Sequence, residues 1–489
     1  MVIRCTYEQA GDENMLIRSL LLVTLALAAS HVHAASLYAG ASMLSITPDR
    51  PVALDGQLST RISQGVESEL TASALALESR DGETTVGQAL FVACDLVAIR
   101  EGVIDEVRAA LAPRLPGFDV RKMILSATHT HTAPSLTEGH YLIEVEGVMT
   151  PTEYRAFLVE RVVQVAESAW KSLQPARAGW GLGHAVVGYN RRMLNADGTA
   201  VMYGPVQRDD FRGVEGPEDH AVETLFFWDA KDQLIASTVN VACPSQEVES
   251  AMYVNADFWA PVRAGLRAKH GEHLVVLGWA SACGDISPHI RYRQAAEDRM
   301  RELRGLSRLD EIARRVILAW EEALEGAKKD IKTDPPLSHT VHALGLPERM
   351  VTKEEYEAAI RERDESAKDP KLSRRTVWQQ RVLDRYARQQ AEGAKPYPVE
   401  MHAVRLGDIA IATNPFELFM QYGIQMKARS KALQTFLIQL AGPGTYVPTP
   451  IAAKGGGYSA IVQSNEVGPE GGQMLTDETV KAVNALWAE

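Results

Sequence analysis

The first two thirds of the chain alternate between short apolar runs and longer segments in which apolar residues recur every three to four positions. Short apolar runs bounded by turn residues predict buried strands, and the longer spacing predicts amphipathic helices. The predicted strands are residues 90–94, 122–126, 223–229, 233–243 and 274–279, with 223–229 and 233–243 forming a hairpin; the predicted helices are residues 103–111, 154–173 and 258–269. This order predicts a mixed sheet with helices against it.

The remaining third adds charged helical segments and returns to strands at its end. Residues 295–327 and 353–390 have helical spacing, and the second segment is so charged that little of it can enter a core. We therefore predict a surface helical insertion over about residues 295–395, with a solvated face and no chemical role. Strands are predicted at residues 399–406 and 409–412, a glycine-rich loop at 442–457 and a last helix at 477–487. The fold class expected is α/β (mixed α+β), as one large domain with strand-end loops forming the site.

The N-terminus has the pattern of a secretory signal. Arg18 precedes an apolar run at residues 20–29, and small residues suited to cleavage follow up to residue 35. This pattern predicts a signal peptide over residues 1–35, with Met15 as an alternative start, and a mature domain over 36–489. The protein is then exported, to the periplasm or the extracellular space. The run is too short to span a bilayer, and we expect no transmembrane segment.

The net charge limits the kinds of partner that the protein can bind, and the cysteine content bears on whether it contains a disulfide. A net charge of −12 argues against non-specific binding to nucleic acid. Beyond the signal, Cys94, Cys243 and Cys283 remain, which is an odd number for an exported chain. Either Cys243 and Cys283 form a disulfide at neighbouring strand ends, or all the cysteines are thiols.

Two histidines follow directly on a predicted strand. Residues 126–134 read Ser-Ala-Thr-His-Thr-His-Thr-Ala-Pro and contain His129 and His131. In an extended segment residues two apart share a face, so both imidazoles could reach one metal ion or one substrate. The three interleaved threonines are expected to orient the rings. The position suits a ligand site, because α/β sheets bind ligands at the carboxyl ends of strands.

A second strand ends in Gly284-Asp285-Ile286-Ser287-Pro288. The glycine permits a tight turn, and the proline fixes the backbone after the serine. Ser287 is a candidate nucleophile if a base lies beside it, and otherwise the segment is an ordinary Asp/Ser turn.

Several motifs together resemble the neutral (alkaline, non-lysosomal) ceramidase family, in the family's order from about residue 38 to residue 489. The matching segments are residues 40–48 (Gly-Ala-Ser-Met-Leu-Ser-Ile-Thr-Pro), the Thr-His-Thr-His run, Asn190-Arg191, the Gly-Asp-Ile-Ser-Pro run, residues 444–448 (Gly-Thr-Tyr-Val-Pro) and Gly456-Gly457-Tyr458. The resemblance implies a zinc-dependent amidase acting on a small-molecule, lipid or glycan substrate. Full-length members carry a further C-terminal β-sandwich domain, which we do not expect here.

The resemblance also implies roles for individual residues. His129 and Tyr446 match zinc ligands, Ser287 matches the essential serine, and His131, Arg191 and Tyr458 match positions that line the site. Asp285 is expected among the catalytic residues, and Asn190 and Asn414 among those that contact substrate. Two ligand positions differ from the family pattern: Cys243 stands where a second histidine is expected, and Asn414 where a glutamate is expected. A Cys243 thiolate could bind zinc, with Asn414 as a weaker donor.

Three functions remain open. The leading one is a hydrolase in which a zinc-activated water or Ser287 attacks an amide or acyl carbonyl. His131 would move the proton, while Tyr458 and Arg191 would stabilise the oxyanion. The second is a metal-independent lyase that uses histidine, tyrosine and asparagine on a uronate-containing polysaccharide. The third is an inactive binding homologue.

Overall fold

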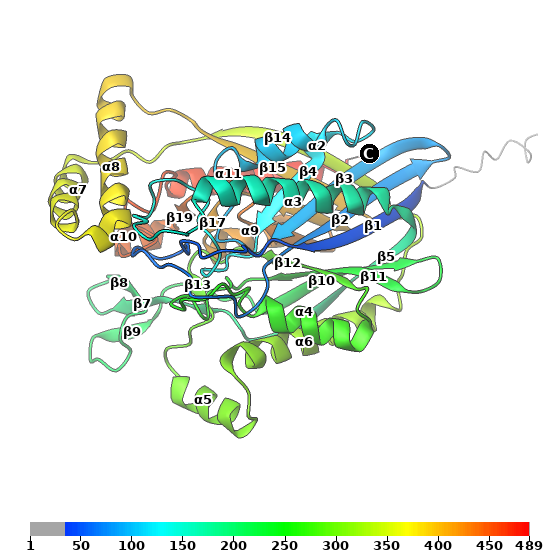
Figure 1. Cartoon of the computed structure of the whole chain (residues 1–489), viewed down its shortest axis with the longest axis horizontal. Coiled ribbons are helices and arrows are strands. Elements are labelled where there is room, and N and C mark those ends of the chain that lie inside the picture. Colours follow the sequence, from blue (N-terminus) through cyan, green and yellow to red (C-terminus); the bar gives the residue numbers. More distant parts are fainter. Residues whose placement is uncertain (1–34, 489) are drawn as a thin grey trace, which may run out of the picture.

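The structure, a computed structural model, describes residues 35–488, and within them two β-sheets pack face to face between layers of helices (Figure 1). The larger sheet has eight strands in the order β12-β11-β10-β5-β1-β2-β3-β4. Its strands are β1 (Ser36–Ser45), β2 (Thr71–Asp81), β3 (Thr84–Cys94), β4 (Met123–Ala127), β5 (Gln174–His184), β10 (Ala221–Asp229), β11 (Leu234–Val241) and β12 (Val275–Ala280).

The second sheet has four strands in the order β14-β15-β16-β18. They are β14 (Leu337–Leu346), β15 (Tyr397–Leu406), β16 (Ile409–Thr413) and β18 (Gln434–Ile438). Shorter pieces pair near the strand ends: β6 (Tyr189–Asn190) with β13 (Ile286–Ser287), β17 (Glu417–Leu418) with β19 (Tyr446–Val447), and β7 (Arg192–Asn195) with β8 (Ala200–Met202) and β9 (Phe211–Val214).

Helices cover the outer faces of both sheets. On the larger sheet lie α2 (Val103–Leu111), α3 (Pro151–Lys171), α4 (Trp259–His270) and α6 (Arg308–Ala327); on the smaller sheet lie α9 (Met420–Arg429) and α11 (Pro469–Ala485). The others are α5 (Gln294–Leu303), α7 (Lys353–Ser366), α8 (Ser373–Glu392) and α10 (Pro450–Gly455). Helix α6 lies so close to β5 that a Cβ at Gly181 would stand 2.1 Å from the Ala323 carbonyl oxygen.

Alternation of side chains explains why the central strands are buried on both faces. In β10, Phe226 and Trp228 face α4 and α6, whereas Leu225 and Phe227 face the second sheet. Successive residues of a strand point to opposite faces, so a continuous apolar run can fill two cores at once. The apolar layer between the two sheets therefore fixes one sheet against the other.

The carboxyl ends of strands from both sheets meet at one edge of this sandwich. The backbone of Ala127, at the end of β4, donates to the Leu440 carbonyl, and Gln439 donates to the Ala280 carbonyl at the end of β12. Asn414, after β16, donates to the Ile438 carbonyl. The loops that leave β4, β12 and β16 are therefore brought together, as expected for a ligand site in an α/β sheet.

A buried ion pair ties the β3 end to the helical layer. Asp95, the residue after β3, accepts from both terminal nitrogens of Arg263 on α4 at 2.7 and 2.9 Å. It also accepts from Thr71 at 2.8 Å (backbone) and 3.0 Å (hydroxyl), and from the Thr128 hydroxyl at 3.1 Å. This one carboxylate thus positions the loop that leads into His129.

The predicted fold class is confirmed: the chain forms one mixed α/β domain with several sheets. The segment predicted as a helical insertion is not helical throughout, because β14 lies within it and pairs antiparallel with β15 along its whole length. The last helix begins at Pro469, eight residues before its predicted start. The signal peptide lies outside the described residues, apart from its final residue. Among the described helices, none combines the length and the apolar character that a membrane crossing requires.

Candidate functional site

The two predicted histidines lie together in the loop after β4 because His129 adopts a left-handed backbone conformation. The extended backbone predicted for this segment is not what brings them together. His129 has a φ of 71°, a conformation that non-glycine residues rarely adopt and that costs about 1–2 kcal/mol. As a result the Nε2 atoms of His129 and His131 lie 3.2 Å apart. The threonines hold the loop backbone instead of the rings: the hydroxyls of Thr130 and Thr132 both donate to the Asn255 carbonyl, each at 2.7 Å.

A carboxylate that the sequence analysis did not identify completes the contact with His129. Glu417 Oε2 lies 3.2 Å from His129 Nε2. Glu417 and Tyr446 are register partners in the short parallel pair of β17 and β19, which places their side chains beside each other. Burial opposes ionisation of Glu417, but the charge of His129 and hydrogen bonds from His129 and Tyr446 lower its pKa below the usual value.

Three polar atoms converge at this point, namely His129 Nε2, His131 Nε2 and Glu417 Oε2. His129 Nδ1 lies 2.7 Å from the Val97 carbonyl oxygen and must donate to it, because a carbonyl can only accept. In a neutral His129 the lone pair on Nε2 therefore faces Glu417 Oε2 and His131 Nε2. Like lone pairs at 3.2 Å repel each other unless a proton or a metal ion lies between them.

Part of the donor set of a catalytic zinc site, which has three protein ligands, is present here. An imidazole whose other nitrogen donates to a backbone carbonyl is the usual form of a ligating histidine. His129 and Glu417 supply one nitrogen and one oxygen donor, and the Tyr446 phenol lies within hydrogen-bonding reach of Glu417. Within residues 35–488, no group of three or more His, Cys, Asp and Glu side chains is arranged to hold a metal ion. A metal at this point would therefore depend on Tyr446 as its third donor.

Arg191 links the second predicted motif to this cluster. β6 and β13 pair antiparallel, with Asn190 opposite Ile286, so the Asn190-Arg191 and Gly284–Pro288 segments lie together. The Arg191 guanidinium donates to the Gly284 carbonyl at 2.8 Å and to the Tyr446 hydroxyl at 3.1 Å. The rings of Tyr446 and Tyr458 meet edge to face, with centroids 5.6 Å apart.

Ser287 and Asp285 lie behind the cavity wall and do not line it. Ser287 Oγ accepts from the Tyr203 hydroxyl at 3.1 Å and from the His289 backbone at 3.0 Å. The Asp285 carboxylate accepts from the Met420 backbone at 2.8 Å and from the Asn190 amide at 2.9 Å. Burial raises the pKa of Asp285 to about 6, although hydrogen bonds oppose this shift. Asp285 and Asn190 are thus engaged in holding the loop.

Cys243 and Asn414 do not take the ligand positions predicted for them. The Cys243 sulfur points to the Val187 carbonyl oxygen at 3.4 Å, and burial raises the pKa of its thiol well above the usual range, so it is not a thiolate. The Asn414 side chain accepts from the Phe416 backbone at 3.0 Å and closes a turn. Neither lines the cavity. Cys94, Cys243 and Cys283 are all free thiols in the structure.

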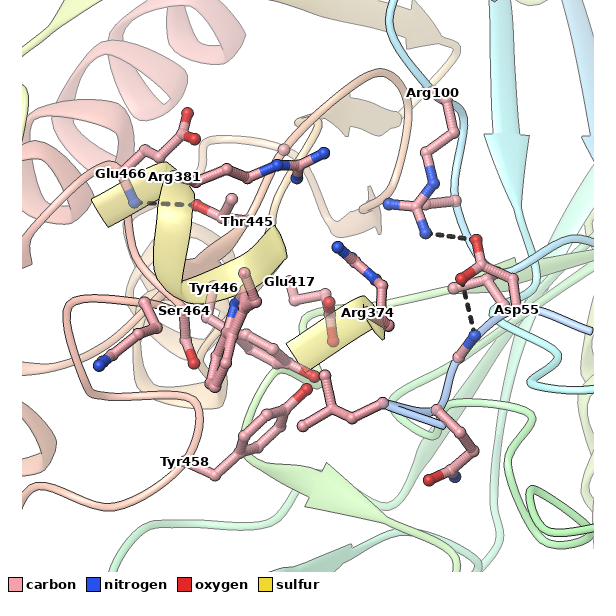
Figure 2. A pocket seen from close by; sticks show the side chains of 18 of the residues that line it. Asp55, Arg100, Arg374, Arg381, Glu417, Thr445, Tyr446, Tyr458, Ser464 and Glu466 are labelled. Carbon is pink, nitrogen blue, oxygen red and sulfur yellow. Dashed lines mark hydrogen bonds and ion pairs between the residues drawn. The ribbon is translucent and has the colours of Figure 1, made fainter. Parts of the chain in front are cut away.

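The cluster opens into a cavity of about 1110 Å³, the mouth included. His129, His131, Glu417, Tyr446 and Tyr458 form its inner wall. Figure 2 shows the two tyrosine hydroxyls and the Glu417 carboxylate directed toward the same space.

The opposite wall is rich in arginine and comes partly from the predicted insertion. Arg374, Arg381 and Arg385 of α8 line the cavity together with Arg100, from the loop after β3. The expectation that residues 353–390 form only a solvated face is therefore wrong. Helical spacing and charge could not predict that these arginines line a cavity, because they do not show against which part of the protein a charged helix face packs.

Other residues of the site also lacked a sequence signal. Glu249 lies 3.4 Å from His131 Nδ1, far from it in sequence and in no motif. Glu417 did have a signal, since it is the only acidic residue between β16 and α9, three positions after Asn414.

Comparison with solved structures gives the fold relationship. The crystal structure of neutral ceramidase from Pseudomonas aeruginosa superposes with a TM-score of 0.66 at 18% identity, covering 92% of this chain and 74% of that chain. A structure described as ceramidase complexed with C2 gives a TM-score of 0.65 at 16% identity, covering 92% and 75%. No protein-family model matches the sequence, and no curated protein does. The chain therefore shares the fold of the neutral ceramidases.

Proposed function

We propose that this protein is a hydrolase that cleaves an amide bond of an acyl substrate in the cavity at His129 and Glu417. The observation that carries the proposal is the convergence of His129 Nε2, His131 Nε2 and Glu417 Oε2 at the inner wall of the cavity. The shared fold with neutral ceramidases supports the same class of reaction.

His129, Glu417 and Tyr446 would hold a zinc ion at this point. Zinc bound there supplies a Lewis acid for the carbonyl oxygen and a water of lowered pKa. Three protein donors leave one position open for substrate or water, as catalytic zinc sites require. The nucleophile in this proposal is water, because Ser287 lies behind the wall and its oxygen is already engaged by Tyr203.

His131 is suited to move the proton of the attacking water to the leaving amine. Its Nδ1 faces the Glu249 carboxylate at 3.4 Å. Burial opposes ionisation of Glu249, but hydrogen bonding and the charge of His131 lower its pKa to about 2, so it is a carboxylate at neutral pH. Glu249 can thus hold the Nδ1 proton, which leaves His131 Nε2 free to accept a proton on the cavity side.

Tyr458 is suited to stabilise negative charge on the carbonyl oxygen from the inner wall of the cavity. Burial raises the pKa of Tyr458, so it remains a neutral phenol that can donate. Arg191 lies behind this wall, donates to the Tyr446 hydroxyl and holds the Tyr446 ring beside Tyr458. Donors fixed before the reaction stabilise the developing oxyanion without reorganisation.

A lyase acting on uronate polysaccharide remains a second candidate, and the arginines of α8 favour it. Elimination beside a carboxylate needs a base, an acid and a group that neutralises the carboxylate. The cavity contains histidines, tyrosines and guanidinium groups that could fill those roles.

Metal removal and reloading test the proposed hydrolase. We expect purified protein to contain about one zinc per chain, and to release free amine from N-acyl substrates. Prolonged chelation should abolish amine release, and zinc should restore it. Tyr446→Phe should retain much less zinc, because it removes the third donor. The measurement is metal analysis beside an amine-release assay, with Tyr397→Phe, a tyrosine outside the cavity lining, as the matched control.

Two outcomes would contradict parts of the proposal separately. Amine release by a metal-free preparation would remove zinc from the mechanism and leave the hydrolase in place. Folded, zinc-loaded protein that releases no amine from a broad set of N-acyl substrates would contradict the hydrolase itself.

A further inference from the structure

We infer that Arg374 and Arg381 bind a carboxylate of the substrate, so that the substrate is an amide with a carboxylate near the scissile bond, as in an N-acyl amino acid. This inference rests on the proposed hydrolase and adds the chemical class of its substrate. The inference is based on one observation: the guanidinium groups of α8 and the His129 and Glu417 cluster line the same cavity.

Helix α8 is fixed in place over the cavity. Val382 and Leu383 of α8 pack with Ala359 of α7 and with Val462, which lies in the segment after Tyr458. Arg385 donates to the carbonyls of Val462 and Asn465 at 2.7 and 2.8 Å. Helix α8 is therefore held against the segment after Tyr458 through Arg385, Val382 and Leu383.

Arg374 enters the cavity without a partner of its own. Figure 2 shows its guanidinium between Asp55 and Glu417, on the side of the cavity opposite Tyr458. Across residues 35–488, its side chain makes no hydrogen bond or ion pair that meets standard distance limits, and its Nη1 is buried and unsatisfied. The Arg374 side chain as a whole is half-buried, but its Nη1 is shielded from water and unpaired, and a bound anion would supply the missing partner.

The nearest carboxylate is already satisfied. Asp55 accepts from Arg100 at 2.6 Å, and its other oxygen accepts from the Tyr141 hydroxyl at 3.0 Å and from the Gly56 backbone at 2.8 Å. Asp55 therefore makes its hydrogen bonds with Arg100, Tyr141 and Gly56 and none with Arg374, although the charge of Arg374 acts on it.

Arg381, whose side chain lines the cavity but is largely exposed to water, adds a second cation with a neutral partner. It donates to His140 Nε2 at 2.6 Å. Burial, followed by the positive charge of Arg374, lowers the pKa of His140 to about 3, so this imidazole is neutral and brings no counter-charge. Burial and the charges of Arg374 and Arg100 also lower the pKa of Arg381, with Glu466 and Asp55 opposing. The positive charges of Arg374, Arg381 and Arg100 thus oppose one another across the cavity.

A single negative charge suits this position better than a double one. Glu417 on the inner wall is ionised and engaged with His129, and Glu466 also lines the cavity. These carboxylates would oppose a dianion next to them, whereas one carboxylate can pair with a guanidinium through two parallel hydrogen bonds. A neutral amide would leave Arg374 unpaired.

An isosteric pair of ligands tests the inference. N-hexanoylglycine carries the carboxylate, and N-hexanoylglycinamide is nearly the same shape without the charge. We expect the protein to bind the glycine compound about 10- to 100-fold more tightly, as measured by calorimetry, which is the range for one charged hydrogen-bonded pair. Arg374→Gln should remove this preference, and Arg374→Lys should keep part of it.

Controls separate this inference from the proposed hydrolase. Arg375→Gln removes the neighbouring charge of α8, which pairs with Glu362 at 3.5 Å outside the cavity, and should leave both affinities unchanged. Thermal melting of each variant shows whether it has folded. Equal wild-type affinity for the two compounds, or a preference that survives in folded Arg374→Gln, would overturn the carboxylate site. Preferential binding without amine release would leave the carboxylate site in place and contradict the hydrolase.

Discussion

Replacing Glu417 by glutamine should lower kcat/KM for amide hydrolysis by about 10²- to 10³-fold or more, the loss typical of removing one preorganised charged group from a catalytic centre. Glu417 Oε2 lies 3.2 Å from His129 Nε2 and beside Tyr446, so the amide would keep the shape of the site and remove its negative charge. Zinc content should fall with activity, because a neutral amide is a weak ligand for a dication. The measurement is steady-state kinetics with metal analysis of the same preparation.

A matched variant distinguishes this effect from a general loss of charge. Glu470→Gln removes an exposed carboxylate on α11, outside the cavity, and should keep wild-type activity and zinc. A folded Glu417→Gln variant with wild-type kcat/KM would mean that the chemistry does not take place at the His129 cluster.

Replacing Asp95 by alanine should destabilise the protein by about 3–5 kcal/mol, because it leaves the Arg263 guanidinium buried and unpaired. Asp95 accepts both terminal nitrogens of Arg263, at 2.7 and 2.9 Å, and also holds Thr71 and Thr128. Loss of the Thr128 contact should also loosen the loop that carries His129, so activity should fall even below the unfolding transition. Chemical denaturation gives the free energy of unfolding.

A surface pair serves as the comparison for Asp95. Arg121 and Asp119 pair at 2.8 Å on the exposed end of the β4 lead-in, and Arg121→Ala should leave the unfolding midpoint unchanged within error. An Asp95→Ala variant as stable as the wild type would show that the buried pair does not hold the two layers together.

The sequence predicted the central strands and several helices because their periodicity is strong. The helix over Val103–Leu111 was predicted with both ends correct, and the β10–β11 hairpin was predicted within a few residues. Strand β14 was missed because its outward face is polar and exposed, which weakens the apolar alternation along it.

The site was predictable only where chemistry sits in a local motif. His129, His131, Tyr446 and Tyr458 lie in recognisable segments, and the structure brings all four to one cavity. Glu417 and Glu249 reach the histidines through tertiary structure, across more than a hundred residues of chain. The sequence also predicted Cys243 as a metal ligand, but in the structure its sulfur points to the Val187 carbonyl oxygen. The direction of this side chain depends on tertiary packing, which the sequence pattern around Cys243 does not contain.

The arginines of α8 show a different limit. A run of charge on a helix predicts exposure, and seven of the twenty residues of α8 are indeed exposed. Which charges turn inward depends on how α7 and α8 pack on Val462, a contact that the sequence pattern does not contain.

The oxygen of the product tests the central claim most directly. The protein should be incubated with N-hexanoylglycine in ¹⁸O-labelled water, and the hexanoate released should be analysed by mass spectrometry. Hydrolysis at the His129 and Glu417 cluster predicts hexanoate with one ¹⁸O atom and an equal amount of free glycine, with both formed at least about 100-fold more slowly by the Glu417→Gln variant. Unlabelled or absent hexanoate from folded, metal-loaded protein, together with an unsaturated product absorbing in the near ultraviolet from uronate polymers, would contradict the hydrolase and favour the lyase.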